Sequence, residues 1–212
     1  MVRSSRPEMI APPSASLIVQ TLNHELFLIM NAPVHPSAFV PIAAMFFATY
    51  LIWLIPTIVL IGWLRGGVRV RKLMLQATAA ALVGLTINHV VGLLWPQPRP
   101  FMIGIGHTLI SHAADPSFPS DHLTLQWAVA FSFILNRRMR TLGVALALLG
   151  LPLAWGRIYV GVHFPVDVVG SILVAGFSAW LCSRYADWIV DPGFRWINTA
   201  YRRLLAPLIR HG

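Results

Sequence analysis

Charged residues are scarce in this chain: they make up 11% of its 212 residues, whereas apolar residues make up 57%. A soluble domain carries about twice that share of charge. The composition therefore excludes an ordinary soluble domain and indicates one integral membrane domain without a separate soluble module. The single cysteine, Cys182, excludes a disulfide framework and a cysteine-based metal site.

Acidic residues are scarcer still, with 7 Asp and Glu against 16 Lys and Arg, which gives a net charge of +9. The basic residues gather in a few loops and the tail, as the positive-inside rule describes, so we expect anionic membrane lipids and no nucleic acid as partners. The N-terminal region does not have the pattern of a signal peptide, because polar residues at 23–25 interrupt its apolar part.

Five hydrophobic stretches approach or exceed the roughly 20 residues that a helical span needs. They are residues 38–64, 73–95, 118–135, 141–160 and 163–183. Residues 17–30 have helical periodicity with polar residues between, which favours a helix lying in the membrane interface. The pattern predicts an all-α membrane bundle of about five transmembrane helices, with interfacial helices at both ends.

We divide the chain into three regions. Residues 1–35 hold a Pro/Ser-rich start, expected to be disordered to about residue 15, followed by the interfacial helix. Residues 36–185 form the membrane domain. Residues 186–212 form an amphipathic tail, in which apolar residues alternate with arginines, and we expect it on the cytoplasmic leaflet.

The orientation follows from the basic residues. Twelve of the 16 Lys and Arg follow the first, third or fifth hydrophobic stretch, and five crossings place those three regions on one side. That side is expected to be cytoplasmic. Three polar clusters then map to the outer end of the bundle, where charged side chains beside hydrocarbon need a compensating role.

The first cluster contains Arg99 between two prolines, after the second hydrophobic stretch. Proline on both sides restricts the backbone, so the guanidinium is held in place. A fixed planar donor fork suits bidentate contact with phosphate oxygens. The alternative is an interfacial arginine that extends toward water.

The second cluster, Pro119-Ser120-Asp121-His122, opens the third stretch. Ser120 is a natural N-cap, and the free amides of the first helical turn form an anion site. Near an anion the protonated form of His122 is favoured, which suits a proton donor. The alternative is an ordinary helix start that happens to include Asp and His.

The third cluster contains Arg157, His163 and Asp167. The i,i+4 spacing places His163 and Asp167 on one helix face. A carboxylate on one imidazole nitrogen fixes the tautomer and leaves the other nitrogen free to attack. The alternatives are an interfacial histidine and a first-turn acid that complements the helix dipole.

Together the clusters supply a nucleophile, its orienting carboxylate, a proton donor, two arginines and a helix N-terminus. This inventory indicates phosphoryl transfer through a phosphohistidine. A metal site is disfavoured, because no carboxylate cluster marks a Mg²⁺ site and the arginines would repel a cation. We therefore expect neither a metal nor another cofactor.

The motifs resemble those of the type 2 phosphatidic acid phosphatase family, which shares its core with vanadium-dependent haloperoxidases. That family has Lys-x6-Arg-Pro, Pro-Ser-Gly-His and Ser-Arg-x5-His-x3-Asp, and the resemblance covers about residues 36–185, most like the bacterial undecaprenyl-diphosphatase branch. It implies a metal-free phosphatase with His163 as nucleophile, Asp167 as its orienter and His122 as general acid. The phosphate would be held by Arg99, Arg157 and Ser120, with Asp121 beside it.

Three positions depart from the family pattern. The first-motif lysine falls at Gly92, and Asn88, His89 and Gln97 are its candidate replacements. The third-motif serine is Gly156, which lacks a hydroxyl. The second-motif glycine is Asp121, which would repel phosphate unless it faces Arg99 or Arg157.

The resulting hypothesis is a phosphatase that removes the terminal phosphate of undecaprenyl diphosphate at the outer face of the bacterial cytoplasmic membrane, serving lipid-carrier recycling. Alternatives are the same chemistry on phosphatidylglycerophosphate, phosphatidate or lipid A, an inactive relative, and a small transporter that uses buried charges. Three residues of the 101–118 loop are candidates for covering the site, although ordinary solvated loop residues are the favoured interpretation: His107, His112 and Asp115.

Overall fold

The structure is a computed structural model that describes residues 14–209, without the side chains of 187, 189 and 200–209. The expected disorder of the N-terminal start lies almost wholly outside the described residues. Within them every regular element is a helix, which confirms the all-α prediction. The elements are α1 (Ala15–Met30), α2 (Phe39–Tyr50), η1 (Leu51–Trp53), α3 (Leu54–Arg65), α4 (Val68–Leu94), η2 (Pro100–Ile103), α5 (Asp121–Ile134), α6 (Arg140–Tyr159), α7 (Pro165–Arg184) and α8 (Ala186–Ile209).

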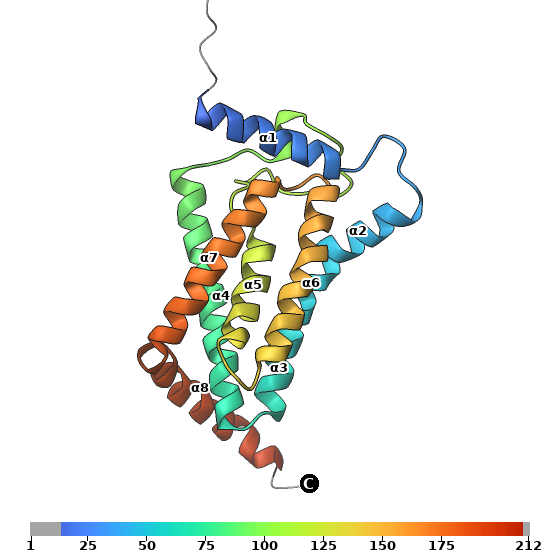
Figure 1. The fold of residues 1–212 in the computed structure, drawn as a ribbon. Helices are drawn as coiled ribbons and strands as arrows, with labels where there is room; N and C mark the ends of the chain where they lie inside the picture. The colour runs from blue at the N-terminus through green and yellow to red at the C-terminus, as the bar shows by residue number, and fades with distance from the viewer. Residues whose placement is uncertain (1–13, 210–212) are drawn as a thin grey trace, which may run out of the picture.

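The helices form an elongated bundle with α5 at its centre (Figure 1). α5 packs against α4, α6 and α7, and α2 packs against α6. α1 lies across one end of the bundle, and α8 lies across the other (Figure 1). The expected helices at both ends are therefore present.

Within residues 14–209, four helical segments are long and apolar enough to cross a membrane: Phe39–Arg65, Val68–Leu94, Arg140–Tyr159 and Pro165–Arg184. α5 has only 14 residues, about 21 Å of helix, which is shorter than a typical hydrocarbon core. Its surroundings explain how a short helix fits: Gln126 donates to the Leu146 carbonyl at 2.8 Å, and the Trp127 indole donates to the Ala147 carbonyl at 3.1 Å. α6 therefore accepts hydrogen bonds from two polar side chains of α5.

The first predicted span is not one continuous α-helix. A 3₁₀ turn at Leu51–Trp53 separates α2 from α3. Pro56 follows this turn and has no amide hydrogen to offer the carbonyl of Ile52, which accounts for the interruption. The tilt of α2 relative to α3 is visible in Figure 1.

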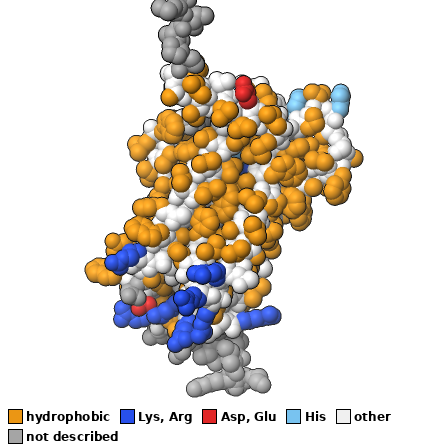
Figure 2. All heavy atoms as spheres, viewed as in Figure 1, with side chains coloured by type: hydrophobic (Ala, Val, Ile, Leu, Met, Phe, Trp, Pro, Cys, Tyr) orange, Lys and Arg blue, Asp and Glu red, His pale blue; other side chains and the backbone are white. Residues whose placement is uncertain are grey.

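Basic side chains gather at the end of the molecule where α8 lies (Figure 2). There Arg65 ends α3, Arg69 lies in the first turn of α4, and Arg137 and Arg138 lie between α5 and α6. Lys72 of α4 also forms an ion pair with Asp191 of α8 at 2.6 Å. The three polar clusters lie at the opposite end of the bundle.

At that opposite end, α1 is attached to the chain segments around it. Asn31, at its C-terminus, donates to the carbonyls of His107 and Tyr159, each at 2.9 Å. Phe27 packs edge-on against Phe164, and the rings are 5.1 Å apart. α1 thereby braces the turn that carries His163.

Candidate active site

His163 is the centre of the site and lies in the turn between α6 and α7, 1% exposed. Three chain segments surround it: the start of η2, the start of α5, and the α6–α7 turn with its flanking helix ends. All three clusters singled out in the sequence meet here, although they are separated by up to 64 residues along the chain.

The Nδ1 side of His163 faces Asp167. Nδ1 lies 3.1 Å from Oδ2 of Asp167. The same oxygen accepts the Phe164 amide at 2.8 Å, which caps the first turn of α7, and a short hydrogen bond from the Ser117 hydroxyl. Pro165 occupies the first helical position, as expected. One carboxylate therefore both caps the helix and orients the imidazole.

The Nε2 side of His163 faces a set of donors. The Ser120 hydroxyl lies 3.0 Å away, an Arg99 Nη1 3.2 Å and an Arg157 Nη2 3.4 Å. With Nδ1–H donated to Asp167, Nε2 carries the lone pair that these groups approach. Nε2 is therefore the ring nitrogen whose lone pair is not tied to Asp167.

Burial is the main reason why the pKa of His163 lies well below its ordinary value, and the charges of Arg157 and Arg99 lower this pKa further. The imidazole is therefore neutral near neutral pH. A neutral ring keeps the Nε2 lone pair available for attack.

Arg99 is held by backbone carbonyls. Its side chain donates to the carbonyls of Asp115, Pro116 and Val162 at 3.0–3.2 Å. It is 4% exposed, so the alternative of an interfacial arginine extending toward water is wrong. The fixed fork directs Nη1 at His163.

Arg157 is also buried, 3% exposed, and its Nη2 also contacts His112 Nε2 at 2.9 Å. Its Nε lies buried with no hydrogen-bond partner among the described residues. A buried donor without a partner costs free energy. Two guanidiniums beside one neutral imidazole thus form a donor-rich, positively charged pocket suited to an anion.

Ser120 occupies the N-cap position of α5, but its side chain does not make the expected capping bond. The hydroxyl faces His163 instead. The Ser120 amide donates to the hydroxyl of Ser171 at 2.9 Å, which fixes the start of α5 on α7. The Ser120 hydroxyl therefore contacts His163 and does not cap α5.

His122 lies half-buried in the first turn of α5, and within the described part of the chain it makes no hydrogen bond. Electrostatic interactions with Arg157, His112 and Arg99 place it at the same site. Asp121 is exposed, and its Oδ1 accepts from Asn88 Nδ2 of α4 at 2.8 Å. No described arginine forms a hydrogen bond or ion pair with Asp121.

Four residues at the site lie outside the three sequence motifs. Ser117 and Ser171 are buried serines in no motif. The fold brings the Ser117 hydroxyl to the Asp167 carboxylate, whereas Ser171, one turn further along α7, donates to the Asp167 backbone carbonyl. His112 and Asp115 were expected to be ordinary loop residues, and this expectation is wrong. Asp115 Oδ1 pairs with Arg99 Nε at 3.0 Å, and His112 contacts Arg157. The sequence signal for these two residues was their position in a charged loop between the first and second motifs.

Two departures from the motif pattern have structural explanations. A Cβ at Gly156 would lie 2.8 Å from the Ala44 carbonyl oxygen, because α2 packs closely on α6 there. A Cβ at Gly92 would lie 3.3 Å from Pro116. Asn88, a candidate replacement for the lysine, instead bonds Asp121 and Thr124.

A neutral imidazole hydrogen-bonded to a carboxylate faces two buried guanidiniums at one end of the helical bundle, an arrangement suited to binding a phosphate group. The model of the PAP2 superfamily matches residues 72–191. The chain therefore belongs to the PAP2 superfamily and is a lipid phosphatase.

Among curated relatives, the chain is 39% identical to undecaprenyl-diphosphatase BcrC of Bacillus subtilis, over 78% of this chain and 85% of that protein. It is 36% identical to the putative undecaprenyl-diphosphatase YbjG of Escherichia coli, over 79% and 83% of the two chains.

Two solved structures share the fold. The crystal structure of Aquifex aeolicus LpxE superposes with a TM-score of 0.63 at 22% identity, covering 77% of this chain and 96% of that one. A transmembrane PAP2-type phosphatidylglycerolphosphate phosphatase from Bacillus subtilis gives a TM-score of 0.58 at 17% identity, over 81% and 88% of the chains. The bundle is therefore that of a multi-pass membrane protein.

Proposed function

We propose that this lipid phosphatase removes the terminal phosphate of a polyprenyl diphosphate, of the undecaprenyl diphosphate type, through a phosphohistidine intermediate. The observation that carries the proposal is the convergence on His163 Nε2 of Ser120, Arg99 and Arg157, at 3.0–3.4 Å. Donors gathered around a nucleophilic atom are placed to hold the oxygens of the group that it attacks.

In the first step Nε2 of His163 attacks the terminal phosphorus, and the bond to the bridging oxygen breaks. The bound phosphate favours the protonated form of His122. The protonated ring gives its proton to that oxygen, so the lipid monophosphate leaves without an unfavourable charge. Asp167 stabilises the positive charge that develops on the His163 ring. In the second step water, deprotonated by His122, cleaves the N–P bond and releases orthophosphate.

The arginines act on the phosphate oxygens. The unpartnered Nε of Arg157 and the Nη groups of both arginines supply donors for oxygens whose negative charge spreads in the transition state. The second stage of the reaction uses the same contacts. Neither stage requires a metal.

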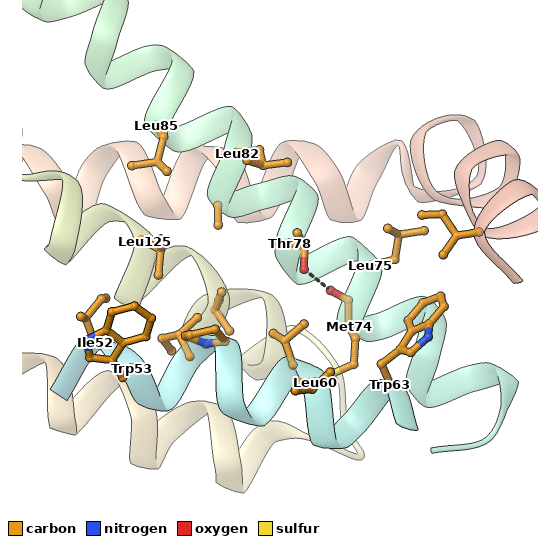
Figure 3. Close-up of a pocket in the computed structure, with 16 residues that line it drawn as sticks. Ile52, Trp53, Leu60, Trp63, Met74, Leu75, Thr78, Leu82, Leu85 and Leu125 are labelled. Atoms are coloured by element: carbon orange, nitrogen blue, oxygen red, sulfur yellow. Dashed lines mark hydrogen bonds between the residues drawn. The ribbon is translucent and has the colours of Figure 1, made fainter. Parts of the chain in front are cut away.

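The lipid tail is assigned to an apolar groove of about 570 Å³ between α3 and α4, which α5 closes from behind (Figure 3). The hydroxyl of Thr78 in its wall is bonded to the Met74 carbonyl at 2.9 Å, so this hydroxyl is not free. Leu85 and Leu125 line the groove. Each lies about one helical turn from a residue at the site end, Asn88 and Asp121.

The groove therefore starts below the headgroup site and runs toward α8, where Ile197 lines it. An isoprenoid chain matches its apolar wall. The names of the curated relatives agree with a diphosphate carrying such a chain.

The membrane assignment is the bacterial cytoplasmic membrane with the site facing outward. Basic side chains gather at the end opposite His163 (Figure 2), and the positive-inside rule places that end in the cytoplasm. α8 then lies on the cytoplasmic leaflet, where its arginines meet anionic lipids.

The direct test is phosphate release from undecaprenyl diphosphate by purified protein in detergent, compared with phosphatidylglycerophosphate, phosphatidate and lipid A. The diphosphate is expected to give the highest kcat/KM, and EDTA is expected to leave the rate unchanged. Loss of activity with EDTA would contradict the metal-free mechanism, and no release from any substrate would indicate an inactive relative.

Two variants test the roles. His163→Ala is expected to abolish turnover, and His122→Ala to lower kcat by ~10²–10⁴-fold, the range of acid–base groups. Acid-labile ³²P on the wild-type protein, absent from His163→Ala, would report the phosphohistidine. A near-normal rate in His163→Ala would end the nucleophile assignment.

Chain length tests the groove. Leu85→Trp fills the groove and is expected to raise KM for undecaprenyl diphosphate while leaving KM for a short isoprenoid diphosphate near the wild-type value. Leu148→Trp, at an exposed position of α6 outside the groove, is the matched control. Equal effects of Leu85→Trp on both substrates would remove the tail assignment.

A further inference from the structure

The segment between η2 and α5, residues 104–117, crosses the outer end of the bundle and brings two ionisable side chains onto the site arginines. Asp115 pairs with Arg99, and His112 contacts Arg157. Neither residue belongs to a motif, and the mechanism above uses neither of them.

His112 lies within reach of the group that the arginines hold. Its Nε2 is 2.9 Å from Arg157 Nη2, and its ring centroid is 6.4 Å from that of His163. The side chain is 19% exposed, so it is at the mouth of the site and not in free solvent. A phosphate between Arg157 and His163 therefore has His112 as its neighbour.

The hydrogen bonds of His112 define its protonation. Nδ1 donates to the Ala113 carbonyl at 3.1 Å, and Nε2 accepts from Arg157, so the ring is neutral. Burial lowers the pKa of His112, the bond to Ala113 partly opposes this, and the charges of Arg99 and Arg157 lower it further. Asp115 acts in the opposite direction.

Binding of an anion at the site favours the protonated form of His112. A phosphate on the two guanidiniums neutralises the charges that keep His112 neutral, and it offers an acceptor for an Nε2–H. His163 and His122 are the other titratable groups that interact with His112, and both are His side chains of the same site. Phosphate binding is thereby coupled to proton uptake by His112.

The packing of the segment links His112 to the position of the first-motif lysine. Gly92 stands at that position, and a side chain there would start 3.3 Å from Pro116. Pro116 directly follows Asp115 in the segment. Because Gly92 has no side chain, the segment approaches α4 closely at Pro116. The same segment brings His112 to the site.

We propose that His112 is a phosphate-binding residue, which becomes protonated as the substrate binds and supplies the positive charge that Gly92 lacks. The proposal rests on the proposed function. It makes substrate affinity dependent on pH in a way that a lysine at the site would not.

The test compares His112→Ala and His112→Lys with a control in the same segment, His107→Ala, whose side chain is exposed. At pH 6 His112→Ala is expected to raise KM about tenfold or more, the effect of one hydrogen bond to a charged group, with kcat changed by less than about threefold. His112→Lys is expected to keep a low KM, and His107→Ala the wild-type KM.

The pH dependence of KM tests whether His112 takes up a proton when the substrate binds. The wild-type KM, divided by that of His112→Lys, is expected to rise between pH 6 and pH 8, because ionisation of the substrate and of His122 cancels in the ratio. A constant ratio, together with an unchanged KM in His112→Ala, would overturn the proposal even though the enzyme hydrolyses the lipid.

Calorimetry with inorganic phosphate gives a result that does not depend on lipid turnover. In two buffers of different ionisation enthalpy, the wild type is expected to take up about one proton more per bound phosphate than His112→Lys. Equal uptake would overturn the role of His112. Greater uptake by a wild type that hydrolyses no lipid phosphate would support His112 while removing the proposed function.

Discussion

Nδ1 of His163 lies 3.1 Å from Oδ2 of Asp167, and both side chains are almost completely buried, one turn of helix apart. Burial strengthens this interaction, because water does not compete for either partner. Oδ2 also accepts the Phe164 amide and the Ser117 hydroxyl. These two hydrogen bonds hold the Asp167 carboxylate in place, and the carboxylate in turn orients the His163 ring.

Replacing Asp167 by Asn tests this relationship. The amide retains the shape but loses the negative charge that stabilises the imidazolium and selects its tautomer. We expect kcat to fall by ~10²–10⁴-fold with little change in KM. Steady-state kinetics on the preferred diphosphate measures this, and a kcat within about fivefold of the wild type would contradict the orienting role.

Ser117→Ala removes one of the three donors to Asp167 while leaving the carboxylate in place. A hydrogen bond to a charged group contributes about 1.5–3 kcal/mol. We expect kcat to fall about tenfold, because the carboxylate is then less firmly oriented. Ser111→Ala, at an exposed position in the same segment, is the control and should keep the wild-type kcat. Indistinguishable rates for both variants would mean that Ser117 serves packing alone.

The buried His163 also predicts a pH dependence of stability. Its pKa is about 6.5 in the unfolded chain and well below that in the folded protein, mainly because of burial. Below about pH 6.5 the unfolded state binds the additional proton, so the free energy of unfolding falls as the pH falls. Its contribution to stability is complete above pH 6.5.

Thermal unfolding in detergent from pH 8 to pH 5 measures this effect. The apparent Tm of the wild type is expected to fall below pH 6.5 more steeply than that of His163→Asn. His107→Asn, with an exposed side chain, should follow the wild type. Parallel curves for all three proteins would show that His163 does not contribute.

Much of the fold was predictable from the sequence, because hydrophobic runs and basic loops are local signals. The α6 boundaries differ from the predicted 141–160 by one residue at each end. The break at η1 was not predicted, since Pro56 in an apolar run does not by itself fix where the helix changes direction. The stretch 118–135 was predicted as a shorter span, and α5 is shorter again at 14 residues, because its buried environment depends on three neighbouring helices.

The geometry of the site was predictable where spacing determines it, as for His163 and Asp167, which lie one helical turn apart. The orientation of Ser120 was not, because an N-cap serine normally bonds its own helix and only the position of His163 redirects it. The roles of His112 and Ser117 depend on how residues 104–117 cross the bundle. No local pattern encodes that path.

Replacing Asp115 is expected to improve substrate binding, whereas the replacements of Asp167 and Ser117 are expected to slow catalysis. Although burial raises its pKa, the hydrogen bond and charge of Arg99 lower that pKa below the ordinary value, so the side chain is a carboxylate. Arg99 remains held by three carbonyls without it. Asp115→Asn removes a negative charge that competes with phosphate, and KM is expected to fall about two- to fivefold, the modest effect of a half-exposed ion pair.

Kinetics at low and high salt checks this expectation. The difference between Asp115→Asn and the wild type should shrink as salt screens the exposed carboxylate. An increase in KM would instead mean that the carboxylate is required to orient Arg99.

Gly156→Ser restores the hydroxyl of the third motif, and we expect it to harm the protein. The new Cβ would lie 2.8 Å from the Ala44 carbonyl oxygen and 3.0 Å from the Ala48 amide nitrogen, both in the backbone of α2. Backbone atoms cannot move aside as a flexible side chain does, so α2 must separate from α6. Overpacking of this kind costs about 1–3 kcal/mol.

Differential scanning fluorimetry of Gly156→Ser should show a lower Tm without a gain in kcat. Gly67→Ala, with open space around its Cβ, should keep the wild-type Tm. A stable Gly156→Ser protein with higher activity would show that the close contact between α2 and α6 is not what excludes the serine.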